Sequence, residues 1–118
     1  MDRISFRALL LTKIVDQKVW ADVVPEEKTL PAIAYTHIVS GGERLLDGIK
    51  VNEWDNWRVI AIGNSRAECD AMTLLLEELD NTDTDTFKTI YIENTQSISS
   101  EPDDATFRNF VDIRTYDR

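Results

Sequence analysis

Side chains that could act as catalytic groups are few and far apart in this sequence. His37 is the single histidine, and no neighbour in the sequence completes a nucleophile–base pair with it. Cys69 has only Arg66 as a basic neighbour, whereas a reactive thiol needs an electropositive, partly exposed site. We interpret His37 as a half-buried strand residue and Cys69 as a small apolar residue of a helix. The pattern predicts that the protein is not an enzyme.

Three carboxylates lie close together in a run of Asp, Asn and Thr: Asp80, Asp83 and Asp85. An EF-hand calcium loop requires glycine at its sixth position and glutamate at its twelfth. A loop starting at Asp80 would have Tyr91 at the twelfth position, and one starting at Asp83 would have Asn94 there. We therefore predict a solvated acidic loop that holds no metal.

The segment Ser40-Gly41-Gly42 could approach a phosphate group through its backbone. A phosphate-binding loop of that kind leads into a helix and is completed by a Lys-Ser/Thr pair. Neither feature follows in this sequence. We interpret the segment as a turn that ends a strand, and we predict no cofactor.

Two tryptophans lie among basic residues, a pattern that in other proteins binds single-stranded nucleic acid by stacking. Acidic side chains interleave with the basic ones here and cancel their charge: Asp47, Glu53 and Asp55 against Arg44, Lys50 and Arg58. Trp and Arg are enriched at contacts between proteins, so core packing or such a contact is the better interpretation. The predicted subunit or partner interface comprises Arg44, Asp47, Glu53, Trp54 and Trp57.

The spacing of apolar residues, prolines and glycines predicts the elements that hold these side chains. Helices are expected over Asp2–Val15 and Arg66–Leu79, the second beginning with a capping box from Ser65 to Glu68. Strands are expected over Val19–Val24, Ala32–Ser40, Trp57–Gly63, Phe87–Ile92 and Thr106–Thr115. The segment Gly41–Asn56, with a turn signal at Asp47-Gly48, is predicted to be either a long hairpin arm or an ordered loop.

The resulting order, α-β-β-β-α-β-β, predicts an α+β fold with a mostly antiparallel sheet and two helices packed on one face. The chain has 118 residues and a mass of 13.5 kDa, the size of one domain, so residues 1–118 are expected to form a single domain. Hydrophobic residues make up 42% and charged residues 30%, which excludes a disordered chain.

The balance of charge is strongly acidic. Thirteen Lys and Arg stand against 22 Asp and Glu, a net charge of −9, so non-specific binding of nucleic acid is disfavoured. The apolar stretch Ala8–Leu11 is too short for a signal peptide or a membrane span. We expect a protein that is made and kept in a cytosol, does not bind a membrane, and keeps its one cysteine reduced.

Segments spread over nearly the whole chain carry a family resemblance. They are the first helix with a strand ending in Val24-Pro25, then Leu30–Tyr35, Ile38–Gly41, Arg58–Ile62, the helix with Arg66-Ala-Glu68 and the acidic Leu74–Leu79, and the final strand Phe110–Tyr116. In these segments the chain resembles the phage tail-completion family. That family comprises the tail terminator, or tail-to-head joining, proteins of long-tailed bacteriophages and prophages.

The resemblance implies a ring of subunits, commonly six, that caps the tail tube and has no enzyme activity. It implies as partners other copies of this chain, the tail tube protein and a head-completion or connector protein. The protein would lie in the virion at the head–tail interface, after assembly in the host cytoplasm. DNA would pass through the ring unbound, and we predict that Asp80, Asp83 and Asp85 line this passage, with Glu101, Asp103 and Asp104 as a second acidic set.

A second interpretation belongs to a different class of protein. The same acidic composition fits a small adaptor or inhibitor that binds a basic partner protein, for example as a decoy of nucleic acid. An adaptor of this kind stays monomeric or dimeric, whereas a ring protein forms a higher oligomer or assembles on tail tubes. An enzyme subunit or weak hydrolase is a third interpretation, and it lacks the residues for catalysis.

Overall fold

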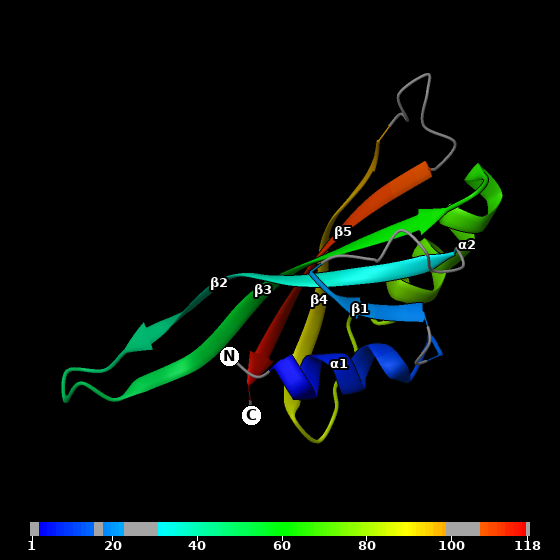
Figure 1. The fold of residues 1–118 in the computed structure, drawn as a ribbon. Coiled ribbons are helices and arrows are strands. Elements are labelled where there is room, and N and C mark those ends of the chain that lie inside the picture. Colours follow the sequence, from blue (N-terminus) through cyan, green and yellow to red (C-terminus); the bar gives the residue numbers. More distant parts are fainter. Residues whose placement is uncertain (1–2, 16–17, 23–30, 99–106, 118) are drawn as a thin grey trace.

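The computed structural model describes residues 3–15, 18–22, 31–98 and 107–117. Two helices and five strands follow one another in the predicted order (Figure 1). Their bounds are α1 Arg3–Leu11, β1 Val19–Ala21, β2 Ala32–Arg44, β3 Lys50–Gly63, α2 Arg66–Glu77, β4 Phe87–Ile98 and β5 Phe107–Asp117.

The five strands form one sheet in the order β1-β2-β3-β5-β4. The short strand β1 lies at one edge and pairs with β2 in parallel, whereas the other three pairs are antiparallel. The predicted α+β fold with a mostly antiparallel sheet is therefore confirmed.

Alternate residues of the central strands form a single core with both helices. One row of this core runs across the sheet through Tyr35, Val59 and Val111, which lie opposite one another in register. Helix α1 contributes Phe6, Leu9 and Leu10, and α2 contributes Cys69, Met72 and Leu76. Because one cluster contains both helices and the same strand face, the expected packing of two helices on one face is also confirmed.

An aromatic stack joins α1 to the middle of the sheet. The rings of Phe6 and Trp57 lie parallel with their centroids 4.1 Å apart, and Tyr35 packs against Phe6 at 5.9 Å. Trp57 is only 1% exposed, and its indole N–H donates a hydrogen bond to Oγ1 of Thr115 at 3.0 Å. The polar edge of the buried indole is thereby satisfied, as buried tryptophan requires.

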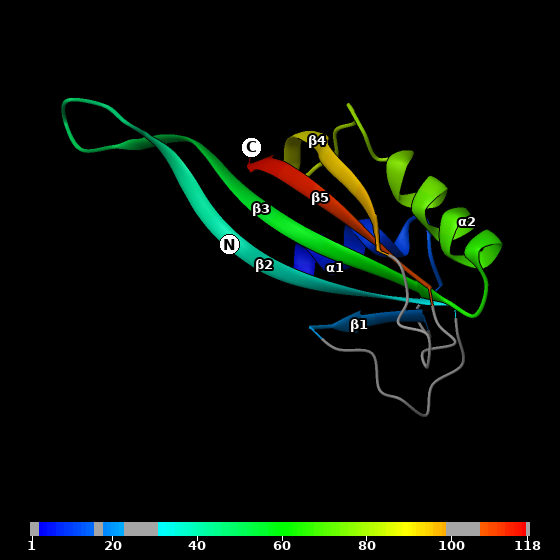
Figure 2. The same ribbon diagram turned by 90° about the horizontal axis from the view of Figure 1, so that it is seen from above.

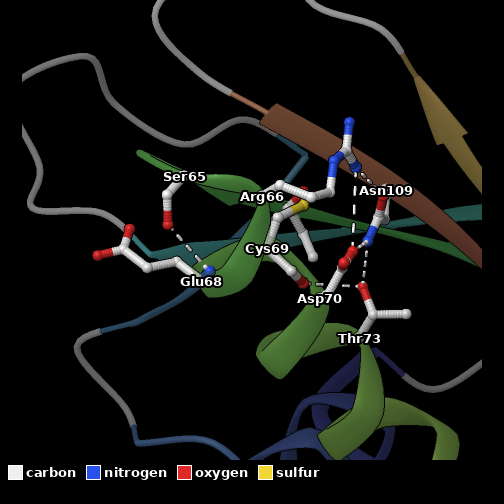
Figure 3. A network of polar contacts seen from close by, with 8 residues as sticks. Ser65, Arg66, Glu68, Cys69, Asp70, Thr73 and Asn109 are labelled. Carbon is white, nitrogen blue, oxygen red and sulfur yellow. Dashed lines mark hydrogen bonds and ion pairs between the residues drawn. The ribbon is translucent and has the colours of Figure 1, made fainter.

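Helix α2 begins at the predicted cap. The backbone N–H of Glu68 donates to Oγ of Ser65 at 3.2 Å (Figure 3). The Glu68 carboxylate, expected to return to the Ser65 N–H, instead accepts from the backbone N–H of Asn64 at 2.9 Å. A Cβ at Gly63 would lie 2.8 Å from the backbone nitrogen of Cys69, so a residue without a side chain lets the strand approach the helix.

A buried amide fixes α2 against the sheet. Asn109 of β5 donates to Oγ1 of Thr73 at 2.8 Å and to Oδ1 of Asp70 at 3.0 Å, and its own oxygen accepts from Arg66 at 2.8 Å (Figure 3). Cys69 adds a contact from its thiol to the carbonyl oxygen of Ala61 at 3.3 Å. These directional bonds set the position of the helix more narrowly than apolar packing does.

The strands differ from the prediction mainly in length. Strands β2 and β3 continue through the segment Gly41–Asn56, which settles the open choice in favour of a hairpin arm. Strand β4 runs six residues past the predicted end at Ile92. The first helix ends at Leu11, four residues early, and β1 is described only as Val19–Ala21. Four residues of the predicted helices and strands lie outside the described residues: Asp2, Val23, Val24 and Thr106.

Truncation of Leu76 tests the packing of α2. This side chain is fully buried, so Leu76→Ala should lower the free energy of unfolding by about 2–5 kcal/mol, through lost burial and a residual cavity. Leu74 is 63% exposed on the same helix, so Leu74→Ala should change that free energy by less than about 0.5 kcal/mol. Urea denaturation of the two variants checks this, and equal effects would contradict the assigned buried face.

Candidate subunit interface: the β2–β3 arm

The hairpin of β2 and β3 extends well beyond the body of the molecule. We define the arm as residues 42–53, the part of the hairpin beyond the register pair Gly41 and Trp54. Both views show the arm projecting past the helices (Figures 1 and 2). The molecule is accordingly elongated, with extents of 55 × 25 × 23 Å.

The tip of the arm is a closed turn. The backbone N–H of Leu45 donates to the Ile49 carbonyl at 2.8 Å, and the Asp47 carboxylate accepts from the Ile49 N–H at 3.1 Å. Gly48 has φ of 88°, a left-handed conformation that glycine adopts without strain, and Arg44 donates to its carbonyl at 3.2 Å. The turn signal at Asp47-Gly48 therefore marks the reversal of the chain.

Apolar side chains are concentrated on this turn and are open to solvent. Leu46 is fully exposed, and Leu45 and Ile49 are each more than half exposed. Ile38 and Val39, just before the arm, are also exposed. A cluster of exposed apolar residues on a projecting element is typical of a contact with another protein.

Two irregularities in the pairing bend the hairpin where it leaves the body. The register between β2 and β3 shifts between His37 and Val39 and again between Gly41 and Glu43. An extra residue in one strand increases the local twist and bend of an antiparallel pair. Figure 2 shows the resulting curve of both strands.

Trp54 anchors the base of the arm. A Cβ on Gly41 would lie 2.2 Å from the Trp54 ring, so the indole lies directly on the Gly41 backbone. Arg114 places its guanidinium 4.2 Å from the centroid of the same ring, a cation–π contact. Arg114 is held by Asn56 and Glu93, each with an oxygen 2.9 Å from Nε.

A polar trio lies on the other face of the hairpin, next to the core. The Ser40 hydroxyl donates to the Asp55 carboxylate, and His37 Nε2 is 2.9 Å from both Ser40 Oγ and Asp55 Oδ1. Asp55 is only 2% exposed, and the imidazole packs edge-on against Trp57. A Ser-His-Asp relay needs the hydroxyl and the carboxylate on different ring nitrogens. Here the Ser40 hydroxyl and the Asp55 carboxylate both contact Nε2 of His37, so the trio links β2 to β3 at the base of the arm.

The residues predicted as an interface separate into three groups. Arg44, Asp47 and Glu53 lie exposed on the arm. Trp54 is partly buried at its base, in the contacts described above. Trp57 lies in the core against Phe6, so its ring belongs to the fold of the subunit and not to the outer surface.

The exposed apolar tip was missed as a set by sequence reasoning. Its members are Leu45, Leu46 and Ile49. The signal that could have revealed them is three large apolar residues around a turn motif, where polar residues are usual.

The acidic loop between α2 and β4 is exposed at Asp80, Asp83 and Asp85. Asp80 also has a local role, because its carboxylate accepts the backbone N–H of Ile92 at 2.8 Å. Residues Phe87 and Asp117 are register partners, as are Trp54 and Tyr116, so the loop and the arm lie toward the same end of the sheet. Glu101, Asp103 and Asp104 are outside the described residues.

Two arginines on the sheet face away from the helices, Arg58 and Arg114, have acidic partners. Arg58 forms two hydrogen bonds to Asp112, at 2.9 and 3.3 Å, and lies over the ring of Phe110. The bonds to Asp112 raise the pKa of the Arg58 guanidinium above its ordinary value.

In the described part of the chain, no three His, Cys, Asp or Glu side chains are grouped as metal ligands. Neither of the described helices is long and apolar enough to cross a membrane.

A solved structure described as the virion of native gene transfer agent (GTA) particle contains a chain with a similar fold. The two chains have a TM-score of 0.57 and 14% sequence identity, over 97% of this chain and 87% of that chain. At this low identity the likeness concerns the fold. No protein-family model matches the sequence, and no curated protein matches it either.

Substitution of Gly41 tests the anchor of the arm. Gly41→Ala should push the Trp54 ring off β2 and lower the free energy of unfolding by about 1–3 kcal/mol, because the new Cβ overlaps the indole. Urea denaturation in the native and Trp54→Ala backgrounds gives the comparison. The alanine should cost much less once the indole is removed, and an equal cost in both backgrounds would contradict the anchor.

Proposed function

We propose that this protein is a structural component of a phage or prophage particle. In this proposal it caps the tail tube as a ring of subunits, commonly six, joins the tail to the head, and catalyses no reaction. The observation that carries the proposal is the arm, which presents exposed apolar residues on a small acidic α+β domain. The shared fold with a chain of a virion supports it, as does the resemblance to tail-completion proteins.

The exposed tip favours a protein that functions in an assembly. Leu45, Leu46 and Ile49 belong to the exposed turn of an arm that projects past the helices (Figure 1), so a second molecule is needed to remove them from water. Burial of apolar surface at about 25 cal/mol per Å² would stabilise that contact. In a ring, each subunit can present its arm to a neighbour and receive one in turn.

The charge of the chain fits a passage for DNA. A net charge of −9 on each subunit is multiplied in a ring, and carboxylates that face the opening repel the phosphate backbone. Asp80, Asp83 and Asp85 are exposed on one connection and remain the candidates for the lining. DNA would therefore move through the ring without binding to it.

Size measurement and imaging test the proposed function. The purified protein is examined by analytical ultracentrifugation and negative-stain microscopy, alone and with tail tubes assembled from the tube protein of the same genome. We expect rings in solution or on the tube ends. A monomer or dimer that leaves the tube ends bare would contradict the proposal, and its capture of a basic protein would favour the adaptor or inhibitor.

Removal of the arm should separate folding from assembly. Replacing residues 42–53 with Asn-Gly joins Gly41 to Trp54 through a two-residue hairpin turn and keeps the Trp54 anchor. Thermal unfolding should remain cooperative, because the core cluster lies outside this segment. Rings and completed tails should be lost in the same imaging assay. Normal tails from the shortened protein would show that the arm is not needed.

Neutralisation of the acidic loop tests the passage. The triple variant Asp80→Asn, Asp83→Asn and Asp85→Asn should unfold at nearly the same temperature, since exposed carboxylates contribute little. Asn at position 80 retains an oxygen to accept the Ile92 N–H. Assembled particles should bind DNA more strongly or eject it more slowly. DNA retention and ejection equal to those of the parent would refute the lining and leave the ring untouched.

A further inference from the structure

Helix α1 forms one wall of a shallow apolar groove. Its volume is about 260 Å³, and its lining residues are Arg3, Ile4, Arg7, Ala8, Leu11 and Tyr35. Ile4, one of these lining residues, is 84% exposed, so the groove leaves most of an apolar side chain in contact with water. None of the roles assigned above involves this groove. A ligand bound in it would lie against Ile4.

The tip of the arm has the chemistry that this groove would accept. Leu46 is a fully exposed aliphatic side chain at the apex, with Asp47 next to it. Arg3 and Arg7 place two cationic side chains in the lining of the groove, and the Arg3 guanidinium also lies 3.6 Å from a carboxylate oxygen of Asp22. An apolar residue followed by a carboxylate therefore matches an apolar groove that contains arginines, both in hydrophobicity and in charge.

The arm of the same chain does not occupy this groove. Figures 1 and 2 both show the tip pointing away from α1. The anchor of Trp54 between Gly41 and Arg114 holds the base of the arm in that direction. The tip and the groove lie far apart on one chain, so they can meet only between two copies, in a head-to-tail contact. Contacts of this kind form a closed ring when the rotation from one subunit to the next divides a full turn evenly.

We propose that the groove on α1 is the docking site for the arm tip of a second copy of this chain. Leu46 of one copy covers Ile4 of the next, and Asp47 approaches Arg3 and Arg7. The inference rests on the proposed function in taking a second copy as the occupant. It adds the two surfaces that meet and the head-to-tail direction of the ring.

Chemical cross-linking between two single-site variants tests this contact. Leu46→Cys and Ile4→Cys are prepared separately, mixed at high concentration, and treated with a short bis-maleimide, with and without tail tubes. Native Cys69 is buried, and burial raises the pKa of its thiol, so the parent protein supplies the blank. The matched control mixes Leu46→Cys with Leu74→Cys, whose cysteine is exposed on α2.

We expect a covalent dimer from the Leu46→Cys and Ile4→Cys mixture, in a yield at least several-fold above that of the control mixture. Equal yields in the two mixtures, with and without tubes, would overturn the docking site. If rings form and tubes are capped but the two mixtures give equal cross-linking yields, the proposed function is supported and this contact is refuted. Strong selective cross-linking without capped tubes would keep the contact and refute the tail function.

Discussion

A mismatch of lengths determines the shape of this molecule. Helices α1 and α2 have 9 and 12 residues, about 14 and 18 Å at 1.5 Å per residue. Strands β2 and β3 have 13 and 14 residues, about 43 and 46 Å at 3.3 Å per residue. The helices therefore cover only part of the hairpin, and the remainder must stand in solvent or against another molecule.

The covered and uncovered parts are stabilised in different ways. Near the helices, burial of apolar surface is combined with directional contacts: Phe6 stacks on Trp57, and Asn109 binds the polar groups of α2. Where the helices end, Trp54 and the His37–Ser40–Asp55 trio pack on opposite faces of the hairpin. These two contacts fix the direction of the arm at the point where the core can no longer do so.

The extent to which the sequence predicts this structure follows from how local each signal is. Helix α2 was predictable because the cap from Ser65 to Glu68 is complete within four residues. The roles of Trp54 and Trp57 could not be predicted in this way. Residues three apart on a strand face opposite sides of the sheet, and the strand register decides which side is buried. The bond from His37 to Asp55 spans 18 residues and depends on the same register. The apolar tip is marked in the sequence only by large apolar residues around a turn, and its exposure follows from how far the hairpin extends past the helices.

Backbone amides of the arm and of the covered sheet differ in the free energy needed to expose them to solvent. Amides of the sheet behind α1 and α2 exchange with solvent only when the core opens, at a free energy near that of global unfolding. The pairs between residues 43–44 and 50–51 have no helix over them and can open locally at a much smaller free energy. The same amides become slow to exchange when a second molecule covers the arm. Hydrogen exchange at these amides would therefore detect a molecule that covers the arm, while exchange in the core stays unchanged.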